Sequence, residues 1–264
     1  MPLEAVLFDW AGTTIDYGSR APLLAFQQTF AHYGISLSDE EIRRDMGLDK
    51  MVHIRQLLKT PDVAATLATI LPTDDQGEMA ATIFARFKRT LLEILPKTVV
   101  LKPGVRALVD YLDLVKIPYG TTSGYDADMI GRILPLANVA GYHPRVNVTS
   151  EMTAGIGRPD PAMNRLAMAQ LDVSHPSQVL IVGDTINDIK AALAAGAQAV
   201  GIIEGSNLLA YSKKDWHALD DDVRAALKER VRIQYEAAGA DLIVDDASEL
   251  LRLLQQAHKE EVTA

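Results

Sequence analysis

Short apolar runs, each followed by a polar turn, recur along this chain and constrain its fold more than any other feature. The runs at 3–8 and 179–182 are rich in Leu, Val, Ile and Phe, and they lead into Asp9 and Asp184. Runs this short and apolar are typical of the buried strands of a parallel sheet. From residue 105 onwards, helical segments separate successive runs. The sequence therefore predicts an α/β fold with a doubly wound parallel-sheet (Rossmann-like) core and helices on both faces. We expect strands at 3–8, 118–122, 146–149, 179–182, 198–203 and 242–244.

The stretch from residue 21 to residue 95 differs from the rest, because it carries helix signals and no convincing strand. Ser38 and Glu41 have the spacing of a capping box, which marks the start of a helix. The expected helices lie at 22–32, 38–47, 50–58 and 75–94, with Pro61 stopping the third. Since the first strand belongs with the alternating part, the helical stretch is an insertion after it. We predict a core domain formed by 1–18 plus 99–264 and an inserted all-helical domain at 19–98.

Composition and charge exclude several functional classes. The chain has 264 residues, with 26 Lys and Arg against 35 Asp and Glu, a net charge of −9 and no basic cluster. Nucleic acid and anionic membrane surfaces are therefore poor candidates for partners. The absence of cysteine excludes disulfides and thiolate metal sites. No apolar stretch approaches the roughly 18 residues that a membrane helix needs, and the N-terminus lacks the features of a signal peptide. We therefore expect a cytoplasmic protein with no membrane partner.

Three polar clusters come directly after predicted strands, at 9–13, 121–124 and 183–188, and a fourth, at 157–161, precedes a helix. In an open α/β sheet, ligands bind outside the carboxyl ends of the strands. We therefore expect these clusters to meet at one edge of the sheet. A single aspartate after a strand is more often a helix cap or a turn residue, but four such segments in this order are hard to explain by capping.

The residue types in these clusters suit the binding and transfer of a phosphoryl group. Asp9, Asp184 and Asp188 offer the hard oxygen ligands that Mg²⁺ prefers, so Mg²⁺ is the expected cofactor. Ser123 offers a hydroxyl and Arg158 a fixed cation for phosphate oxygens. An aspartate carboxylate can also attack phosphorus and form an aspartyl phosphate.

The order of the four segments resembles that of the haloacid dehalogenase superfamily of phosphotransferases. The resemblance implies that Asp9 is the nucleophile, that Ser123 and Arg158 bind the phosphoryl group, and that Asp184 and Asp188 belong to the metal-binding acidic motif. It also implies that the helical insertion is a mobile cap domain, whose closure excludes water from the site.

One position departs from the commonest pattern of that superfamily. Most of its phosphatases have a second aspartate two residues after the nucleophile, which protonates the oxygen leaving group, whereas this chain has Ala11 there. A phosphate ester needs its leaving alkoxide protonated. Ala11 therefore favours a reaction whose leaving group is not an alkoxide.

The cap segment 46–53 is similar to a motif of the phosphonoacetaldehyde hydrolase (phosphonatase) family, in which a lysine forms a Schiff base with the substrate aldehyde. Lys50 matches that lysine, and His53 lies three residues further along the same helical face. Asp49 and Val52 depart from the commonest residues of the motif. The segments 9–14, 123–125, 157–159 and 239–240 also resemble that family.

The resemblance implies a small phosphonate substrate and a role in phosphonate catabolism. The C–P bond of phosphonoacetaldehyde is hydrolysed to acetaldehyde and phosphate, through a Schiff base on Lys50 and an aspartyl phosphate on Asp9. Mg²⁺ is held by Asp9, the Ala11 carbonyl and Asp184. Asp188 is a further residue of the metal site, which supports these ligands or binds the metal through a water. The other residues expected to contact substrate are Met46, Gly47, His53 and Tyr125. A cap-mediated homodimer is also expected.

Schiff-base chemistry requires the amine of Lys50 to be neutral. Burial under a closed cap, or a nearby cation such as protonated His53, would lower the pKa of Lys50. The sequence leaves both causes open.

Two other functions stay open at this point. One is a phosphomonoesterase or phosphomutase of the same superfamily, which Ala11 and Lys50 disfavour. The other is a non-catalytic binding module, which would release no phosphate from any substrate. Nucleotide binding has no support, because no glycine-rich phosphate-binding pattern follows a strand.

Overall fold

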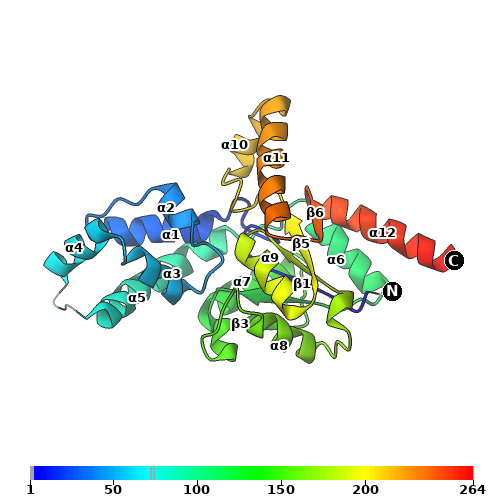
Figure 1. Ribbon diagram of the computed structural model, residues 1–264, viewed down its shortest axis with the longest axis horizontal. Coiled ribbons are helices and arrows are strands. Elements are labelled where there is room, and N and C mark those ends of the chain that lie inside the picture. The colour runs from blue at the N-terminus through cyan, green and yellow to red at the C-terminus, as the bar shows by residue number, and fades with distance from the viewer. Residues whose placement is uncertain (1–2, 72, 74, 264) are drawn as a thin grey trace.

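The computed structural model describes residues 3–71, 73 and 75–263, and its centre is a six-stranded, wholly parallel sheet (Figure 1). The strand order is β3-β2-β1-β4-β5-β6, so the chain starts in the middle of the sheet and fills first one side and then the other. The strands are β1 (Ala5–Phe8), β2 (Tyr119–Ser123), β3 (Asn147–Thr149), β4 (Val179–Gly183), β5 (Gln198–Ile202) and β6 (Leu242–Val244). This confirms the predicted fold class.

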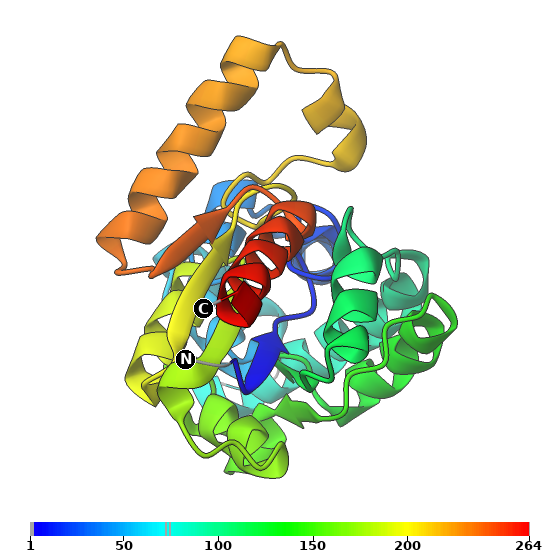
Figure 2. The same cartoon turned by 90° about the vertical axis from the view of Figure 1, so that its right-hand side faces the viewer.

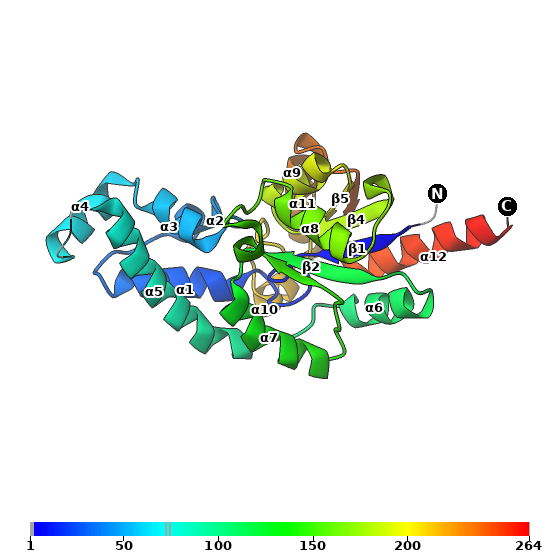
Figure 3. The ribbon, with the colours of Figure 1, turned by 90° about the horizontal axis from the view of Figure 1, so that it is seen from below.

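Consecutive residues of β1 face opposite sides of the sheet and are buried in two separate cores. Val6 and Phe8 pack in the core on one face, and Ala5 and Leu7 pack in the core on the other. This alternation is the two-residue period of a strand covered on both faces. The first face is covered by α6 (Val105–Leu114), α7 (Ala127–Val139) and α12 (Ala247–Thr263), and the second by α8 (Ala162–Gln170), α9 (Ile186–Ala195) and α11 (Asp221–Ala237) (Figure 3).

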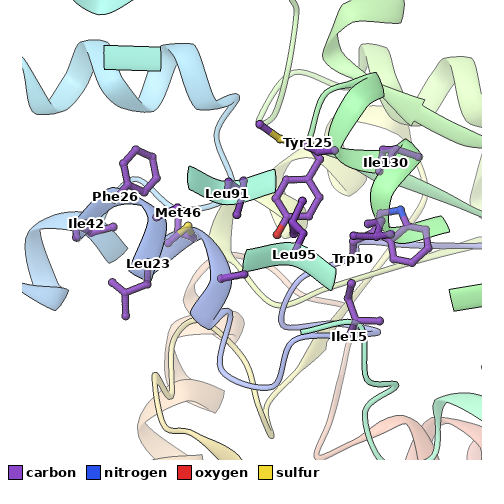
Figure 4. Close-up of a cluster of buried hydrophobic side chains, with 14 of the residues drawn as sticks. Trp10, Ile15, Leu23, Phe26, Ile42, Met46, Leu91, Leu95, Tyr125 and Ile130 are labelled. Atoms are coloured by element: carbon purple, nitrogen blue, oxygen red, sulfur yellow. The ribbon is translucent and has the colours of Figure 1, made fainter. Parts of the chain in front are cut away.

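Between β1 and α6 the chain forms a helical unit, the cap, which extends beside the sheet (Figure 1, blue to cyan). Its helices are α1 (Arg20–Ala31), α2 (Asp39–Arg43), α3 (Lys50–Leu57), α4 (Pro61–Ile70) and α5 (Gln76–Ile94), followed by a short 3₁₀ helix at Leu95–Lys97. The long α5 packs along α1 and α3. Phe26 lies at the centre of this packing, with its ring 4.3 Å from that of Phe87 and 4.2 Å from that of His53, measured between centroids. The apolar packing of the cap is continuous with the core on the first face of the sheet (Figure 4).

The sequence does not predict α4, because Pro61 is expected to stop a helix. In the structure Pro61 is instead the first residue of α4, where its missing N–H has no helical partner to lose. Val63 and Leu67 bury one side of this helix. Because only these two residues of α4 are buried, the amphipathic pattern of this helix in the sequence is weak.

The two crossings between the cap and the core lie side by side. Ile15 pairs with Leu101 in an antiparallel bridge, and the N–H of Lys102 donates to the carbonyl of Thr14 at 2.8 Å. Asp16 then fixes the start of α1, since its Oδ2 accepts the N–H of Ala21 at 2.8 Å. The domain boundaries 18/19 and 98/99, which lie a few residues from these contacts on the cap side, stay a prediction.

Between β5 and β6 the chain leaves the core and forms α10 (Lys213–His217) and α11, which project from the body (Figure 2). Tyr235 anchors α11, because its hydroxyl donates to the carbonyl of Ile202 at 3.0 Å and its ring covers Gly201. The sequence predicts α11 but not α10, whose five residues are too few for a periodic signal. Within the described residues, no helix combines the length and the apolar character needed to cross a membrane.

Candidate active site

The carboxyl ends of three neighbouring strands bring the predicted polar clusters together. Phe8 pairs with Thr121 of β2 and with Val182 of β4, so the residues that follow these positions lie at one edge of the sheet. Asp9 follows β1, Ser123 ends β2, and Asp184 follows β4. This edge is where parallel α/β sheets bind ligands.

Arg158 reaches the same edge and joins the aspartates. Its Nη1 lies 2.7 Å from Asp9 Oδ1 and 2.7 Å from Asp188 Oδ1. Its Nη2 donates to the carbonyl of Thr122 at 2.5 Å and to the Thr122 hydroxyl at 2.9 Å. The guanidinium is therefore held on both sides, with its charge fixed beside the predicted nucleophile.

The carboxylates at this edge are buried and repel one another. Burial raises the pKa of Asp9 to about 6, against the opposing effect of Arg158. Burial raises the pKa of Asp184 to about 8, and the negative charges of Asp9 and Asp188 act in the same direction. A cation placed between Asp9 and Asp184 would relieve this repulsion.

The predicted Mg²⁺ ligands fit such a cation. Asp9, Ala11 and Asp184 all line one cleft, and they supply two carboxylates and a backbone carbonyl, which are the hard oxygen donors that Mg²⁺ takes. Asp184 is held in place by the Thr13 hydroxyl, which donates to Oδ1 at 3.3 Å, and by the N–H of Asn207, which donates to Oδ2 at 2.7 Å. Within the described residues, no three Asp, Glu, His or Cys side chains form a metal cluster.

Asp188 has both carboxylate oxygens engaged by protein groups. Oδ1 contacts Arg158, while Oδ2 accepts the N–H of Thr185 at 3.0 Å and the Thr185 hydroxyl at 2.6 Å. The Thr185 hydroxyl also accepts the N–H of Asp188, so the pair forms a capping box at the start of α9. Asp188 therefore positions Arg158 and α9, the supporting role allowed for it by the sequence.

Lys50 enters the site from the cap, at the first position of α3. It is only 5% exposed. Its Nζ lies 4.0 Å from Met46 Sδ and 5.9 Å from the centre of the Tyr125 ring, both uncharged groups. Burial lowers the pKa of Lys50 to about 8, with Asp9 opposing this effect. The neutral amine, which nucleophilic attack on a carbonyl requires, is therefore far more populated near physiological pH than in an ordinary lysine with a pKa of 10.5.

One narrow cleft contains most of the predicted site residues. Residues of both the cap and the core line it. Tyr125, one of the lining residues, belongs to the same apolar cluster as Leu91 and Leu95 (Figure 4). The predicted residues that line the cleft are Asp9, Ala11, Met46, Gly47, Lys50, Ser123, Tyr125, Arg158 and Asp184. The sequence does not single out four others, Ser19, Pro22, Gly124 and Thr185. Of these, Gly124 and Thr185 belong to the predicted polar clusters at 121–124 and 183–188. The sequence does not predict that these two residues line the cleft.

His53 lies away from the cleft lining, inside the cap. It is fully buried against Phe26, and neither ring nitrogen has a hydrogen-bond partner among the described residues. Burial lowers the pKa of His53 well below its usual value, so the ring is neutral. The cation that helps to lower the pKa of Lys50 is therefore Arg158 rather than protonated His53.

Direct contacts hold the cap against the core around the cleft. The Ser150 hydroxyl donates to Asp49 Oδ2 at 2.7 Å, and Asn187 Nδ2 donates to the carbonyl of Met46 at 3.2 Å. Gly124 lies so close to the cap that a Cβ there would come within 2.8 Å of the Leu48 carbonyl. The structure therefore shows the cleft with its cap closed.

Comparisons with known proteins agree with this geometry. The family model for haloacid dehalogenase-like hydrolases matches residues 3–196. Phosphonoacetaldehyde hydrolase from Lactiplantibacillus plantarum is 48% identical over 97% of this chain and 97% of its own length. Phosphonoacetaldehyde hydrolase from Latilactobacillus sakei is 36% identical over 96% of this chain and 95% of its own length. The crystal structure of a phosphonoacetaldehyde hydrolase-like protein from Oleispira antarctica has a TM-score of 0.91 and 30% identity, and covers 98% of this chain and 94% of its own.

The fold and the site define the class, and the chain is an enzyme of the haloacid dehalogenase-like hydrolases. Within that class the chain belongs to the phosphonoacetaldehyde hydrolase family, as its sequence resemblance predicts.

Proposed function

We propose that this enzyme hydrolyses the carbon–phosphorus bond of phosphonoacetaldehyde to acetaldehyde and phosphate. The observation that carries the proposal is one cleft lined by Lys50, Asp9 and Arg158 together, with Ala11 in place of an acid. An amine suits the aldehyde end of this substrate, while a carboxylate and a guanidinium suit its phosphonate end. The identity to relatives named for this activity supports the same substrate.

The reaction begins at Lys50. The neutral amine attacks the aldehyde carbon, the carbonyl oxygen leaves as water, and the imine nitrogen takes up one proton from solvent, which is returned when the imine is hydrolysed at the end of the cycle. The buried position of Nζ beside Met46 and Tyr125 favours the neutral amine and excludes competing water. The protonated imine then accepts the electron pair of the C–P bond as that bond breaks, which gives an enamine. Because the leaving atom is carbon, no acid is needed at position 11.

Asp9 supplies the electron pair that replaces the C–P bond. Its carboxylate attacks phosphorus and forms an aspartyl phosphate, while Arg158 and Ser123 hold the phosphoryl oxygens. Arg158 already contacts Asp9, so the nucleophile and the anchoring cation are aligned before substrate arrives. Water then hydrolyses the aspartyl phosphate. The enamine takes up a proton on carbon, returns to the imine, and is hydrolysed to acetaldehyde and free Lys50.

Mg²⁺ is the cofactor that the donor set fits, with Asp9, the Ala11 carbonyl and Asp184 as its protein ligands. When bound, it neutralises charge on the phosphoryl group and on the two carboxylates.

The test is a coupled assay that measures acetaldehyde and phosphate released from phosphonoacetaldehyde, with Mg²⁺ and with a chelator. We expect equal amounts of both products and activity that depends on Mg²⁺. Phosphoglycolate and a set of sugar phosphates serve as competing substrates. Faster release of phosphate from one of these esters than from phosphonoacetaldehyde would contradict the proposal.

A further inference from the structure

Asn207 links the cap to the core in a way that the proposed reaction does not use. It is 3% exposed and lies in the loop between β5 and α10. Its Oδ1 accepts Nη1 of Arg43 at 2.9 Å, and its Nδ2 donates to the carbonyl of Arg43 at 3.3 Å. Both ends of the carboxamide are therefore satisfied by one residue, which is the last residue of α2 in the cap.

The backbone of the same asparagine contacts the catalytic edge. The N–H of Asn207 donates to Asp184 Oδ2 at 2.7 Å. The other oxygen of that carboxylate accepts from the Thr13 hydroxyl at 3.3 Å. Asn207 therefore helps to set the orientation of Asp184, and it also bonds directly to Arg43 of the cap.

Arg43 also contacts the crossing between the two parts of the chain. Its Nη1 donates to the carbonyl of Gly18 at 3.1 Å, and the N–H of Gly18 donates to the carbonyl of Gly205 in the Asn207 loop at 2.7 Å. One guanidinium thus joins α2, the crossing and the loop that holds Asp184. If α2 moved away from the core, the buried carboxamide of Asn207 would lose both protein partners.

We propose that Arg43 and Asn207 are positioning residues that make metal binding at Asp184 depend on the closed cap. The inference rests on the proposed function, because it takes Asp184 as a Mg²⁺ ligand. Partners that orient a ligand carboxylate typically contribute 10- to 100-fold to metal affinity. Since linkage is reciprocal, Mg²⁺ in turn favours the closed cap.

The test measures Mg²⁺ alone binding to the whole protein by titration calorimetry. Arg43→Met removes the guanidinium but keeps the length of the side chain, and Asn207→Leu removes the carboxamide but keeps the N–H that donates to Asp184. We expect each variant to bind Mg²⁺ about 10-fold more weakly than the unmodified protein. Arg44→Ala is the matched control, because the neighbouring Arg44 side chain is 62% exposed and pairs only locally with Asp45.

Small-angle X-ray scattering provides a second readout, independent of activity. Mg²⁺ should make the unmodified protein and Arg44→Ala more compact, and this change should be smaller in Arg43→Met. If Asn207→Leu fails to fold, the test rests on Arg43→Met and the conservative Arg43→Lys. We expect Arg43→Lys to bind Mg²⁺ more tightly than Arg43→Met and more weakly than the unmodified protein.

The outcomes separate this inference from the proposed function. Unchanged Mg²⁺ affinity in Arg43→Met, alongside clear binding by the unmodified protein, overturns the positioning role and leaves the proposed function intact. Absence of Mg²⁺ binding by the unmodified protein overturns the metal site and this inference together.

Discussion

Arg158 and Asp9 form an ion pair of 2.7 Å in which the two side chains are only 3% and 10% exposed. The pair has two consequences for the nucleophile. Burial alone would favour a protonated and unreactive carboxyl, whereas the adjacent guanidinium lowers the pKa of Asp9. The cation that favours the ionised form of Asp9 is therefore the same one that we propose binds the phosphoryl group.

Arg158→Lys should lower kcat for phosphonoacetaldehyde at least about 100-fold, comparable with removal of a donor from an oxyanion site. A lysine ammonium cannot contact Asp9, Asp188 and Thr122 from one planar group. Arg165→Lys is a suitable control, since Arg165 makes one exposed hydrogen bond to a carbonyl. A kcat within threefold of the unmodified value, in a folded Arg158→Lys protein, would show that the guanidinium geometry is unimportant.

The amine of Lys50 should titrate near pH 8, because burial lowers its pKa to about 8. Deprotonation favours imine formation, so reactivity toward aldehydes should rise with pH through this value. The measurement is the Cε chemical shift of ¹³C-labelled lysine followed from pH 6 to pH 11. Two resonances should have midpoints near pH 8, because burial also lowers the pKa of Lys102 to about 8, and the one that is absent from Lys50→Met belongs to Lys50. A Lys50 resonance that titrates at the ordinary 10.5 would contradict the buried environment.

The lowered pKa of Lys50 also predicts how the free energy of unfolding depends on pH. The pKa of Lys50 is lower in the folded state than its ordinary value of 10.5, so the unfolded chain binds more protons between about pH 8 and 10.5. The contribution of Lys50 to the free energy of unfolding therefore rises with pH across this window. Below pH 8 the buried ammonium destabilises the fold, and Lys50→Met should raise the thermal midpoint there. An equal rise at pH 7 and pH 10.5 would argue against this linkage.

Ser150→Ala should raise KM about fivefold and change kcat little. The Ser150 hydroxyl donates to Asp49 Oδ2 across the cap–core boundary, and one such bond contributes roughly 1 kcal/mol. Asp49 keeps its other role, because Oδ1 still accepts the N–H groups of Met51 and Val52 at the start of α3. Steady-state kinetics would be compared with Ser174→Ala, which alters an exposed serine. Equal KM values for the two variants would exclude a role for this contact in cap closure.

Ala11→Asp should exchange one activity for another. Ala11 lines the cleft beside Asp9 and Asp184, so a new carboxyl there would be surrounded by negative charge and stay protonated. We expect kcat for phosphonoacetaldehyde to fall at least about 10-fold, and hydrolysis of phosphoglycolate to become measurable, because an acid is now present for an oxygen leaving group. Ala11→Asn matches the volume without the acid. Equal ester hydrolysis by the Asp and Asn variants would contradict the explanation given for Ala11.

The features that the sequence predicts well are those with local signals. The strands β1 and β4 carry apolar runs, and parallel pairing of β1 with β4 and β2 then brings Asp9, Ser123 and Asp184 to one edge. The capping box is confirmed in both directions, since the Ser38 hydroxyl accepts the N–H of Glu41 at 3.2 Å and Glu41 Oε2 accepts the N–H of Ser38 at 2.8 Å.

The features that the sequence does not predict depend on contacts between distant segments. His53 shares a helix with Lys50, yet α3 is packed against α1 and α5 in a way that turns the imidazole into the cap core. Asn207 and Arg43 are 164 positions apart, and neither belongs to a recognisable motif. Asp49 departs from the commonest residue of the cap motif, and the sequence gives no reason for this. The structure gives one, because Asp49 Oδ2 accepts a hydrogen bond from the Ser150 hydroxyl of the core.

The most direct test of the proposed mechanism is reductive trapping of the imine. The protein is incubated with phosphonoacetaldehyde, reduced with borohydride, digested and analysed by mass spectrometry. The mechanism predicts that the peptide containing Lys50 gains an ethyl or phosphonoethyl group on Nζ, in step with irreversible loss of activity, and that Lys50→Arg gains none while losing C–P cleavage. Full C–P cleavage by Lys50→Arg, or a modification found only on other lysines, would contradict the central role of this amine.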